Sequence, residues 1–208
     1  MRIEVTRDGA TKALDPRDTE LSSLFEGGSA RIAVWSDDLP DDREIYRDES
    51  FEWTPIQEEE IVEALKMETV VLDDESWEAG LLFETGGCSQ LAKALAQRNH
   101  GCEVVAVYDG VDEEGGPLQT PHLIHAALTV GDGHVLDANG VSKFEAWFEQ
   151  WSALGMETFF ERYEPGEVPF SYASNSYRLA SQEFAFALSV ACARSLTELS
   201  AKPAPSPR

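Results

Sequence analysis

Three side chains in the middle of the sequence have residue types and local contexts that suit nucleophilic catalysis. Cys88 follows two glycines and precedes Ser89, at the start of a helix that the sequence predicts to run to about Asn99. The N-terminus of a helix offers free N–H groups and a partial positive charge, which favour a thiolate over a thiol. The same N–H groups can hold a developing oxyanion, so Gly87 and Ser89 are candidate oxyanion or substrate contacts.

A predicted hairpin brings the other two residues, His125 and Asp137, together. Residues 123–130 and 134–137 are predicted strands, joined by a tight Gly-Asp-Gly turn. If the turn pairs residue 127 with Asp137, His125 lies on the same face as Asp137, because side chains on a strand alternate with period two. The carboxylate then orients the imidazole, as in a catalytic triad built on a thiol. A register slip of one residue would instead separate the two side chains.

Each of these residues also has a structural interpretation. A cysteine at a helix start is often part of the core, a histidine on a strand often has only structural hydrogen bonds, and an aspartate at a strand end often forms a turn. His122 and His125 with Cys88 could suggest zinc, but residues three apart on a strand point to opposite faces, so we predict no metal and no cofactor. His122 and Thr85 are kept as further candidates for substrate contact.

The order, spacing and context of Cys88, His125 and Asp137 resemble those of the papain-like superfamily. This superfamily includes papain-type and NlpC/P60-type peptidases, transglutaminases, arylamine acetyltransferases and bacterial glutamine deamidases. The resemblance covers about residues 80–145. It implies an α+β fold in which a helix bearing the Cys packs on an antiparallel sheet bearing the His and the Asp. Papain-type enzymes have an aromatic residue where this chain has Ser89, and they use an upstream Gln, of which only Gln57 is present.

The resemblance also implies roles and a reaction. Cys88 would be the nucleophile, His125 the general base and acid, and Asp137 the residue that orients His125. The implied activity is that of a cysteine-dependent hydrolase or acyltransferase acting on an amide bond, as a peptidase, an amidase or a deamidase. Hydrolysis, deamidation and acyl transfer share this chemistry, and the sequence does not separate them.

The elements that must position these residues can be predicted from periodicity and capping signals. The sequence predicts strands at 31–35, 70–72, 103–108, 123–130 and 134–137, and helices at 54–67, 88–99, 143–154 and 181–199. Ser142 is the expected cap of the third helix, whose apolar stripe of Phe144, Trp147, Phe148 and Trp151 is expected to be core. Cys192 is expected to be a buried core thiol. A helix followed by several consecutive strands favours the α+β class.

Acidity is the strongest feature of the composition. The 208 residues include 39 Asp and Glu against 16 Lys and Arg, which gives a formal net charge of −23. Direct binding to nucleic acid or to a membrane is disfavoured, because both need a basic face. A protein or peptide-like substrate, and in particular a basic one, suits this charge. The rival hypothesis is an acidic binding or inhibitor protein without catalysis, such as a DNA mimic or a phage or mobile-element counter-defence protein. Adaptation to high salt would also explain the acidity.

The acidic residues are unevenly distributed along the chain. Residues 1–80 hold 23 acidic and 8 basic side chains, and residues 81–208 hold 16 and 8. We expect an acidic N-terminal part at 1–80 packed on the same domain, a papain-like core at 81–200 and a disordered proline-rich tail at 201–208. The acidic runs at 37–42 and 58–60 are interpreted as solvated segments.

The location of the protein can be inferred from three expected absences. No apolar run approaches the ~20 residues that cross a bilayer, and the first residues are charged rather than signal-like. The three cysteines are odd in number and lack C-x-x-C spacing, which fits neither a disulfide framework nor a zinc knuckle. We therefore expect a cytoplasmic protein with reduced thiols.

Overall fold

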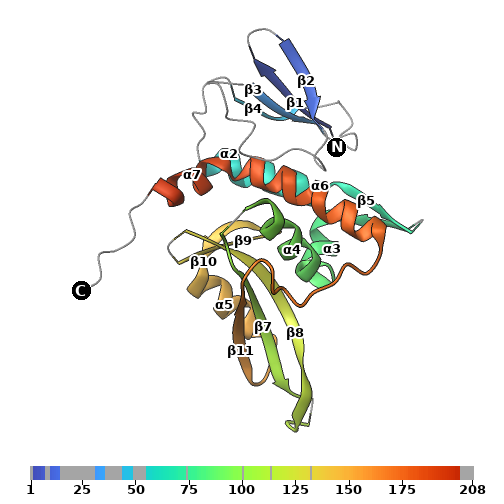
Figure 1. The fold of residues 1–208 in the computed structure, drawn as a ribbon, viewed down its shortest axis with the longest axis vertical. Coiled ribbons are helices and arrows are strands. Elements are labelled where there is room, and N and C mark those ends of the chain that lie inside the picture. Colours follow the sequence, from blue (N-terminus) through green and yellow to red (C-terminus); the bar gives the residue numbers. More distant parts are fainter. Residues whose placement is uncertain are drawn as a thin grey trace.

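Antiparallel sheets and helices make up the residues that the computed structural model describes. These residues are 2–7, 10–14, 31–35, 44–48, 55–73, 75–99, 101–112, 114–131 and 133–201. The expected α+β class is confirmed, because strands pair with antiparallel neighbours and helices cover the larger sheet (Figure 1). The acidic run at 37–42, the Thr54 cap, the side chain of Gln57 and residues 202–208 lie outside the described residues.

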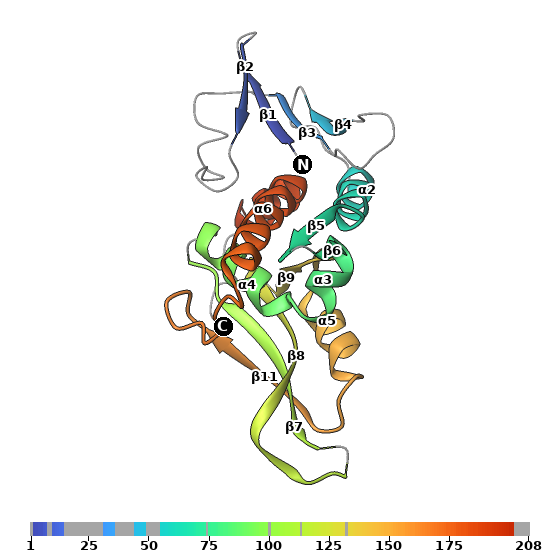
Figure 2. The same ribbon diagram turned by 90° about the vertical axis from the view of Figure 1, so that its right-hand side faces the viewer.

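The larger sheet has five strands in the order β10-β9-β8-β7-β11. Their bounds are β7 (Val104–Val111), β8 (Pro117–Val130), β9 (His134–Asp137), β10 (Gly140–Lys143) and β11 (Thr158–Tyr163). Four of the strands follow one another in sequence, so short turns connect them. β7 and β8 are longer than predicted and project as an arm beyond the rest of the sheet (Figure 2). β10 and β11 were not predicted.

The two faces of this sheet carry different helices. Helix α4 (Cys88–Arg98) packs on one face, and α5 (Phe144–Ser152) packs on the other. Residues of β7 and β8 alternate between the two cores as period two requires. Val104, Ala106, Ala126 and Leu128 share a core with α4, whereas Val105, Val107 and Ala127 pack with Trp147 and Trp151 of α5. The expectation that the apolar stripe of α5 is core is confirmed for Trp147 and Trp151, whereas Phe144 and Phe148 are only partly buried against this core.

The C-terminal helix differs from its prediction. The single helix expected at 181–199 is two helices, α6 (Asn175–Ala191) and α7 (Ala193–Ala201). The first starts six residues earlier than expected because the Ser174 side chain accepts a hydrogen bond from the Tyr177 amide, which is an N-cap. Cys192 separates the helices and is buried, as expected. Ala201, expected in the tail, still belongs to α7.

Two further corrections concern helix starts. Ser142 was expected to cap α5, but it lies in β10, and Lys143 is the cap residue of a helix that begins at Phe144. In α2 (Pro55–Lys66), by contrast, the predicted helix start at Pro55 is confirmed. Proline suits the first helical position because its missing N–H would have no partner there.

The N-terminal part contributes its own sheet and part of the main core. Strands β1 (Arg2–Arg7), β2 (Ala10–Leu14), β3 (Arg31–Trp35) and β4 (Glu44–Asp48) form a sheet in the order β2-β1-β3-β4. Figures 1 and 2 show it beyond α2 and α6, away from the larger sheet. The hairpin β5 (Thr69–Leu72) and β6 (Glu75–Glu78) leads into α3 (Ala79–Thr85). The core that surrounds α4 includes Ile61, Val62, Leu65, Leu72 and Ala79 from this region.

Glu58 contradicts the interpretation of the 58–60 run as solvated. Its buried carboxylate accepts hydrogen bonds from the amide and the hydroxyl of Ser195, at 3.1 and 2.5 Å. Ser195 lies in the first turn of α7, so the carboxylate meets the positive end of that helix. Glu59 and Glu60 are exposed, as expected.

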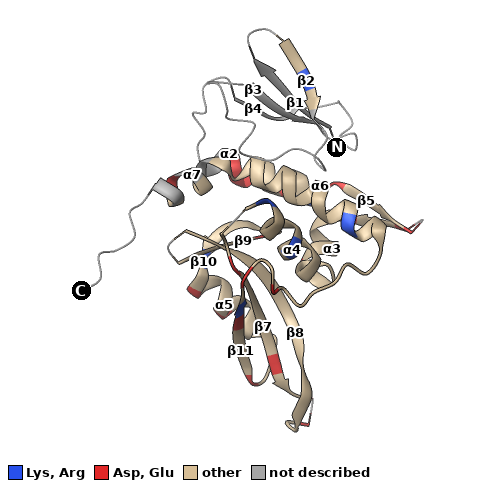
Figure 3. Cartoon of the chain, in the orientation of Figure 1, with Lys and Arg blue, Asp and Glu red and all other residues tan. Residues whose placement is uncertain are grey.

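The remaining acidic residues are spread over several elements. Figure 3 shows them, within the described residues, along α2, the β5–β6 hairpin, the β7–β8 arm and β11 rather than on one element. No helix of the described residues is both long enough and apolar enough to cross a membrane.

Candidate active site

Cys88 is the first residue of α4, where the sequence predicted it. Gly87 is the N-cap, and its carbonyl accepts the amides of Gln90 and Leu91. The amides of Cys88 and Ser89 come first in the helix and have no acceptor one turn earlier within it. Cys88 is 4% exposed, so its sulfur lies within the protein at the positive end of α4.

The two glycines before Cys88 have different surroundings. A Cβ on Gly87 would lie 3.0 Å from the Leu82 carbonyl oxygen and 3.0 Å from the Phe83 ring, with the Tyr177 ring at 3.3 Å. A Cβ on Gly86 would meet nothing within 4 Å. Close packing between α3, α4 and α6 therefore leaves no room for a side chain at Gly87.

The assumed register of the β8–β9 hairpin is confirmed. Leu128 pairs with Leu136 and Thr129 with Val135, so position 127 is next to oppose Asp137. His125 Nε2 and Asp137 Oδ2 lie 3.0 Å apart, and the two side chains are 0% and 3% exposed. The imidazole and the carboxylate thus form a buried hydrogen-bonded pair, as a diagonal pair on one face allows.

Asp137 accepts two further hydrogen bonds. The Asn139 amide donates to Oδ1 at 2.8 Å, and the Trp147 indole Nε1 donates to Oδ2 at 2.9 Å. The same oxygen that faces His125 therefore also faces Trp147, and the second oxygen is held by the backbone. Together these contacts hold the carboxylate in one orientation.

The imidazole of His125 is held by rings as well as by Asp137. The Trp151 ring stacks on it with centroids 3.6 Å apart and planes 12° apart. The Trp147 ring lies 5.9 Å away at 50°. The Nδ1 atom of His125 is buried and has no hydrogen-bond partner among the described residues.

Burial and two neighbouring groups act on His125 in opposite directions. Burial is the largest influence and lowers the pKa of the ring, because it disfavours the charged form. The hydrogen bond with Asp137, followed by interactions with Cys88, outweighs burial and raises the pKa from 6.5 to about 9. Cys88 is therefore close enough to the imidazole to act on its charge, although Nδ1 makes no hydrogen bond to it. Asp137 and Cys88 thus favour the charged form of His125 against the effect of its burial.

The other two cysteines have different environments. All three thiols are free. Burial raises the pKa of Cys102 and, more strongly, that of Cys192. These two thiols are therefore neutral at physiological pH, and they serve as internal references for Cys88.

The remaining sequence-predicted candidates are not all brought to this cluster. Ser89 is half-buried in the first turn of α4 beside Cys88. Thr85 is exposed, and its hydroxyl donates to the Leu81 carbonyl within α3. His122 is exposed on β8, opposite Asp109 of β7. Among the described residues, no recorded hydrogen bond joins Thr85 or His122 to the cluster, and no group of three or more His, Cys, Asp or Glu has metal-binding geometry.

Sequence reasoning missed the roles of three residues around Asp137. Trp147 and Trp151 were predicted as core from their helical spacing, which is correct but incomplete, and Asn139 was not singled out. The closeness of these residues in sequence could have indicated the contacts. Because α5 follows the Asp137 strand after only a few residues, its buried face must cover that strand. The spacing shows which face is buried, but not which polar group the face covers.

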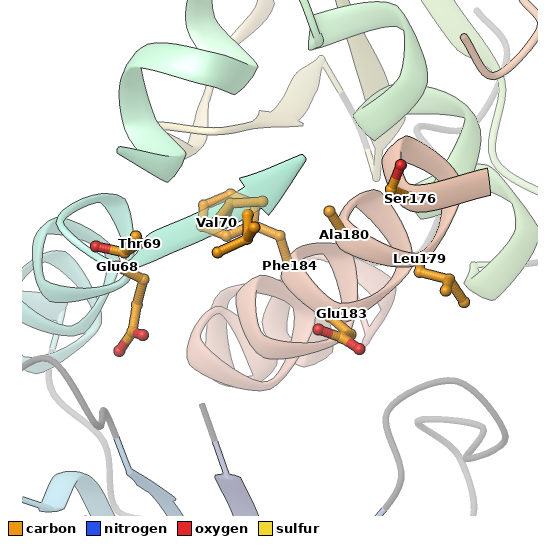
Figure 4. Close-up of a pocket in the computed structure, with 9 residues that line it drawn as sticks. Glu68, Thr69, Val70, Ser176, Leu179, Ala180, Glu183 and Phe184 are labelled. Atoms are coloured by element: carbon orange, nitrogen blue, oxygen red, sulfur yellow. The ribbon is translucent and has the colours of Figure 1, made fainter. Parts of the chain in front are cut away.

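A separate hollow lies away from these residues. A pocket of about 310 Å³ between β5 and α6 is lined by residues that include Glu68, Val70, Ala180, Glu183 and Phe184 (Figure 4). None of Cys88, His125 and Asp137 lines it. The pocket therefore has no part in the chemistry of the cluster.

Comparison with models of protein families, with curated proteins and with solved structures gave no match to this chain.

Proposed function

We propose that this protein is a cysteine-dependent enzyme that acts on an amide bond, with Cys88, His125 and Asp137 as its triad. The observation that carries the proposal is the buried His125–Asp137 hydrogen bond of 3.0 Å on an imidazole that Cys88 also influences. The three side chains come from three different elements, α4, β8 and β9, and all three are buried. A helix start next to an imidazolium is the environment in which cysteines become nucleophiles.

The arrangement supports a papain-like interpretation within that class. The Cys88 helix packs on an antiparallel sheet, and His125 and Asp137 lie on neighbouring strands of that sheet. The order Cys, His, Asp along the chain is that of the superfamily which the sequence resembles. This support comes from the order of the residues and their placement, and it concerns residues 88–137.

The proposed reaction begins with attack on the amide. The Cys88 sulfur forms a bond to the carbonyl carbon, and the amides of Cys88 and Ser89 stabilise the negative charge that develops on the oxygen. The carbon–nitrogen bond then breaks, and His125 gives its proton to the leaving amine or ammonia. The product of this half-reaction is a thioester on Cys88.

Water or an amine completes the reaction. His125, now neutral, takes a proton from the incoming water or amine, which attacks the thioester carbon. The carbon–sulfur bond breaks, the Cys88 thiolate is restored and His125 is a cation again. Water gives hydrolysis or deamidation, and an amine gives acyl transfer.

The proposed substrate is a protein or a peptide-like molecule with basic character. The net charge of −23 concentrates cations around the protein and repels polyanions such as nucleic acid. An amide-bearing basic protein segment meets both requirements, since it offers the scissile bond and the complementary charge.

The decisive experiment measures the relative reactivity of the three thiols. Native protein is treated with iodoacetamide across a pH series, and each cysteine is quantified by peptide mass spectrometry. Cys88 should be modified fastest at neutral pH, and His125→Ala should slow that modification while leaving Cys102 unchanged. Cys102 is the matched control because burial raises its pKa.

A second measurement covers the case in which the reagent cannot reach Cys88. The thiolate absorbs in the ultraviolet, so the spectrum of the native protein minus that of Cys88→Ala reports its charge directly. A thiolate signal at neutral pH that disappears in His125→Ala supports the proposal. Equal reactivity of Cys88 and Cys102 together with no thiolate signal would overturn it.

A further inference from the structure

We propose that Trp147 is a positioning residue that makes Nδ1 of His125 the atom exchanging the proton with Cys88. This inference rests on the proposed function, because it concerns the same triad. It assigns to a tryptophan, which the sequence predicts only as core, a role in fixing the protonation pattern of the site.

Two of the groups that face the Asp137 carboxylate can only donate hydrogen bonds. An indole N–H and a backbone N–H can donate a hydrogen bond but cannot accept one. Trp147 Nε1 donates to Oδ2 at 2.9 Å, and the Asn139 amide donates to Oδ1 at 2.8 Å. Each carboxylate oxygen therefore already faces an obligate donor, and a proton on either oxygen would compete with that donor.

The hydrogen bonds that Asp137 accepts determine which ring nitrogen of His125 carries the proton. Because Asp137 is kept as an acceptor, the ring nitrogen 3.0 Å from Oδ2 must be the donor. In the neutral imidazole only one nitrogen carries a proton, so that proton is on Nε2 and the lone pair is on Nδ1. Nδ1 is buried and has no hydrogen-bond partner among the described residues, so it is the ring nitrogen left to exchange a proton with the thiol.

Burial strengthens the effect of Trp147 on the orientation of Asp137 and His125. Trp147 is 3% exposed, and Asp137 and His125 are as well enclosed. Water therefore does not replace the indole donor readily if it is removed, and a buried carboxylate oxygen that loses a partner is costly. Without Trp147 the carboxylate loses one of the two anchors that hold it in place, and the orientation of the imidazole relaxes with it.

The test uses Trp147→Phe, which keeps an aromatic ring and removes the indole N–H. Trp77→Phe is the matched control, because it removes an indole N–H from the partly exposed Trp77 of β6. ¹⁵N-histidine NMR reports the protonated nitrogen of His125 at a pH above its titration, and iodoacetamide reports the reactivity of Cys88. Circular dichroism and urea unfolding establish that both variants are folded.

Wild type and Trp77→Phe should show Nε2 protonated and Nδ1 unprotonated. Trp147→Phe should show exchange between the two tautomers, and the alkylation of Cys88 at neutral pH should slow by about tenfold, as the loss of one hydrogen bond to a charged group suggests. A Trp147→Phe protein with the tautomer and the alkylation rate of wild type would overturn the inference.

Asp137→Asn provides a second test that leaves the tryptophans in place. The N–H groups of His125, Trp147 and Asn139 point at the two oxygens of Asp137, whereas an amide has only one acceptor oxygen. The three hydrogen bonds therefore cannot all be kept in this variant. The amide nitrogen must then face either the Asn139 N–H or the donors at Oδ2, so the Nδ1-protonated tautomer should be more populated than in wild type. An unchanged tautomer ratio together with an unchanged rate of Cys88 alkylation would contradict the inference. If wild-type Cys88 is unreactive but Trp147→Phe changes the tautomer, the proposed function fails and the positioning role stands.

Discussion

Trp151 covers one whole face of the His125 imidazole, with ring centroids 3.6 Å apart and planes only 12° apart. Its own indole N–H is buried and makes no hydrogen bond among the described residues. Trp151 therefore acts on His125 through its ring, by stacking and by excluding water, whereas Trp147 acts through its N–H. Two tryptophans one helical turn apart thus contact the His125–Asp137 pair in two different ways.

Trp151→Ala should destabilise the fold strongly. Removal of a buried tryptophan costs about 3–5 kcal/mol, because transfer energy and packing are both lost. Trp77→Ala is the comparison, since Trp77 is 38% exposed and its loss should cost about 1 kcal/mol or less. Urea unfolding of both variants measures the difference. Equal losses would mean that the Trp151–His125 stack adds nothing beyond ordinary surface packing.

The stability of the protein should fall as the pH rises from 6.5 to 9. Burial lowers the pKa of His125, but Asp137 and Cys88 raise it to about 9, so the folded chain holds this proton more tightly than the unfolded chain does. The contribution is complete below pH 6.5 and is lost as the pH passes 9. Its full size is about 3 kcal/mol at most.

His125→Gln isolates this contribution from other titrating groups. The free energy of unfolding of wild type minus that of His125→Gln should decrease between these two pH values, as measured by urea unfolding at each. A difference that stays constant over this range would show that the pKa of His125 is not raised by folding.

The two glycines before Cys88 should respond differently to the same substitution. Gly87→Ala places a methyl group 3.0 Å from a carbonyl oxygen and from the Phe83 ring, and it should cost about 1–3 kcal/mol. Gly86→Ala enters open space with a helical backbone, φ −117° and ψ −26°, and should be neutral or slightly stabilising.

Thermal unfolding of the pair provides the measurement. Because Gly87 fixes the start of α4, Gly87→Ala should also slow the alkylation of Cys88, and Gly86→Ala should not. Similar melting temperatures for the two variants would argue against close packing at Gly87.

Local signals in the sequence were sufficient to predict the helix start at Cys88 and the pairing of His125 with Asp137. Two glycines before Cys88 predicted a helix start, and the Gly-Asp-Gly turn predicted the hairpin whose register brings His125 to Asp137. These are short-range features, governed by backbone conformation and by the alternation of side chains. The contacts of Trp147 and Trp151 were beyond such reasoning, because they depend on how α5 crosses a sheet face.

Other predictions from the sequence were wrong where tertiary contacts override local preference. Three consecutive glutamates are usually solvated, yet Glu58 is buried because the start of α7 supplies donors for its carboxylate. The sequence carries no mark of that partner, which lies 137 residues away. The start of α6 was predictable from Ser174, whose cap signal was overlooked in favour of the apolar run that follows.

The short turn between β8 and β9 has a consequence for how the protein folds. His125 and Asp137 are 12 residues apart, so closing that loop costs little chain entropy, and the hairpin can form early. Cys88 lies at the start of α4. This helix packs against α6, which comes much later in the chain. We therefore expect the His125–Asp137 pair to form before Cys88 is in place, and the proposed triad to be complete only after α6 has docked.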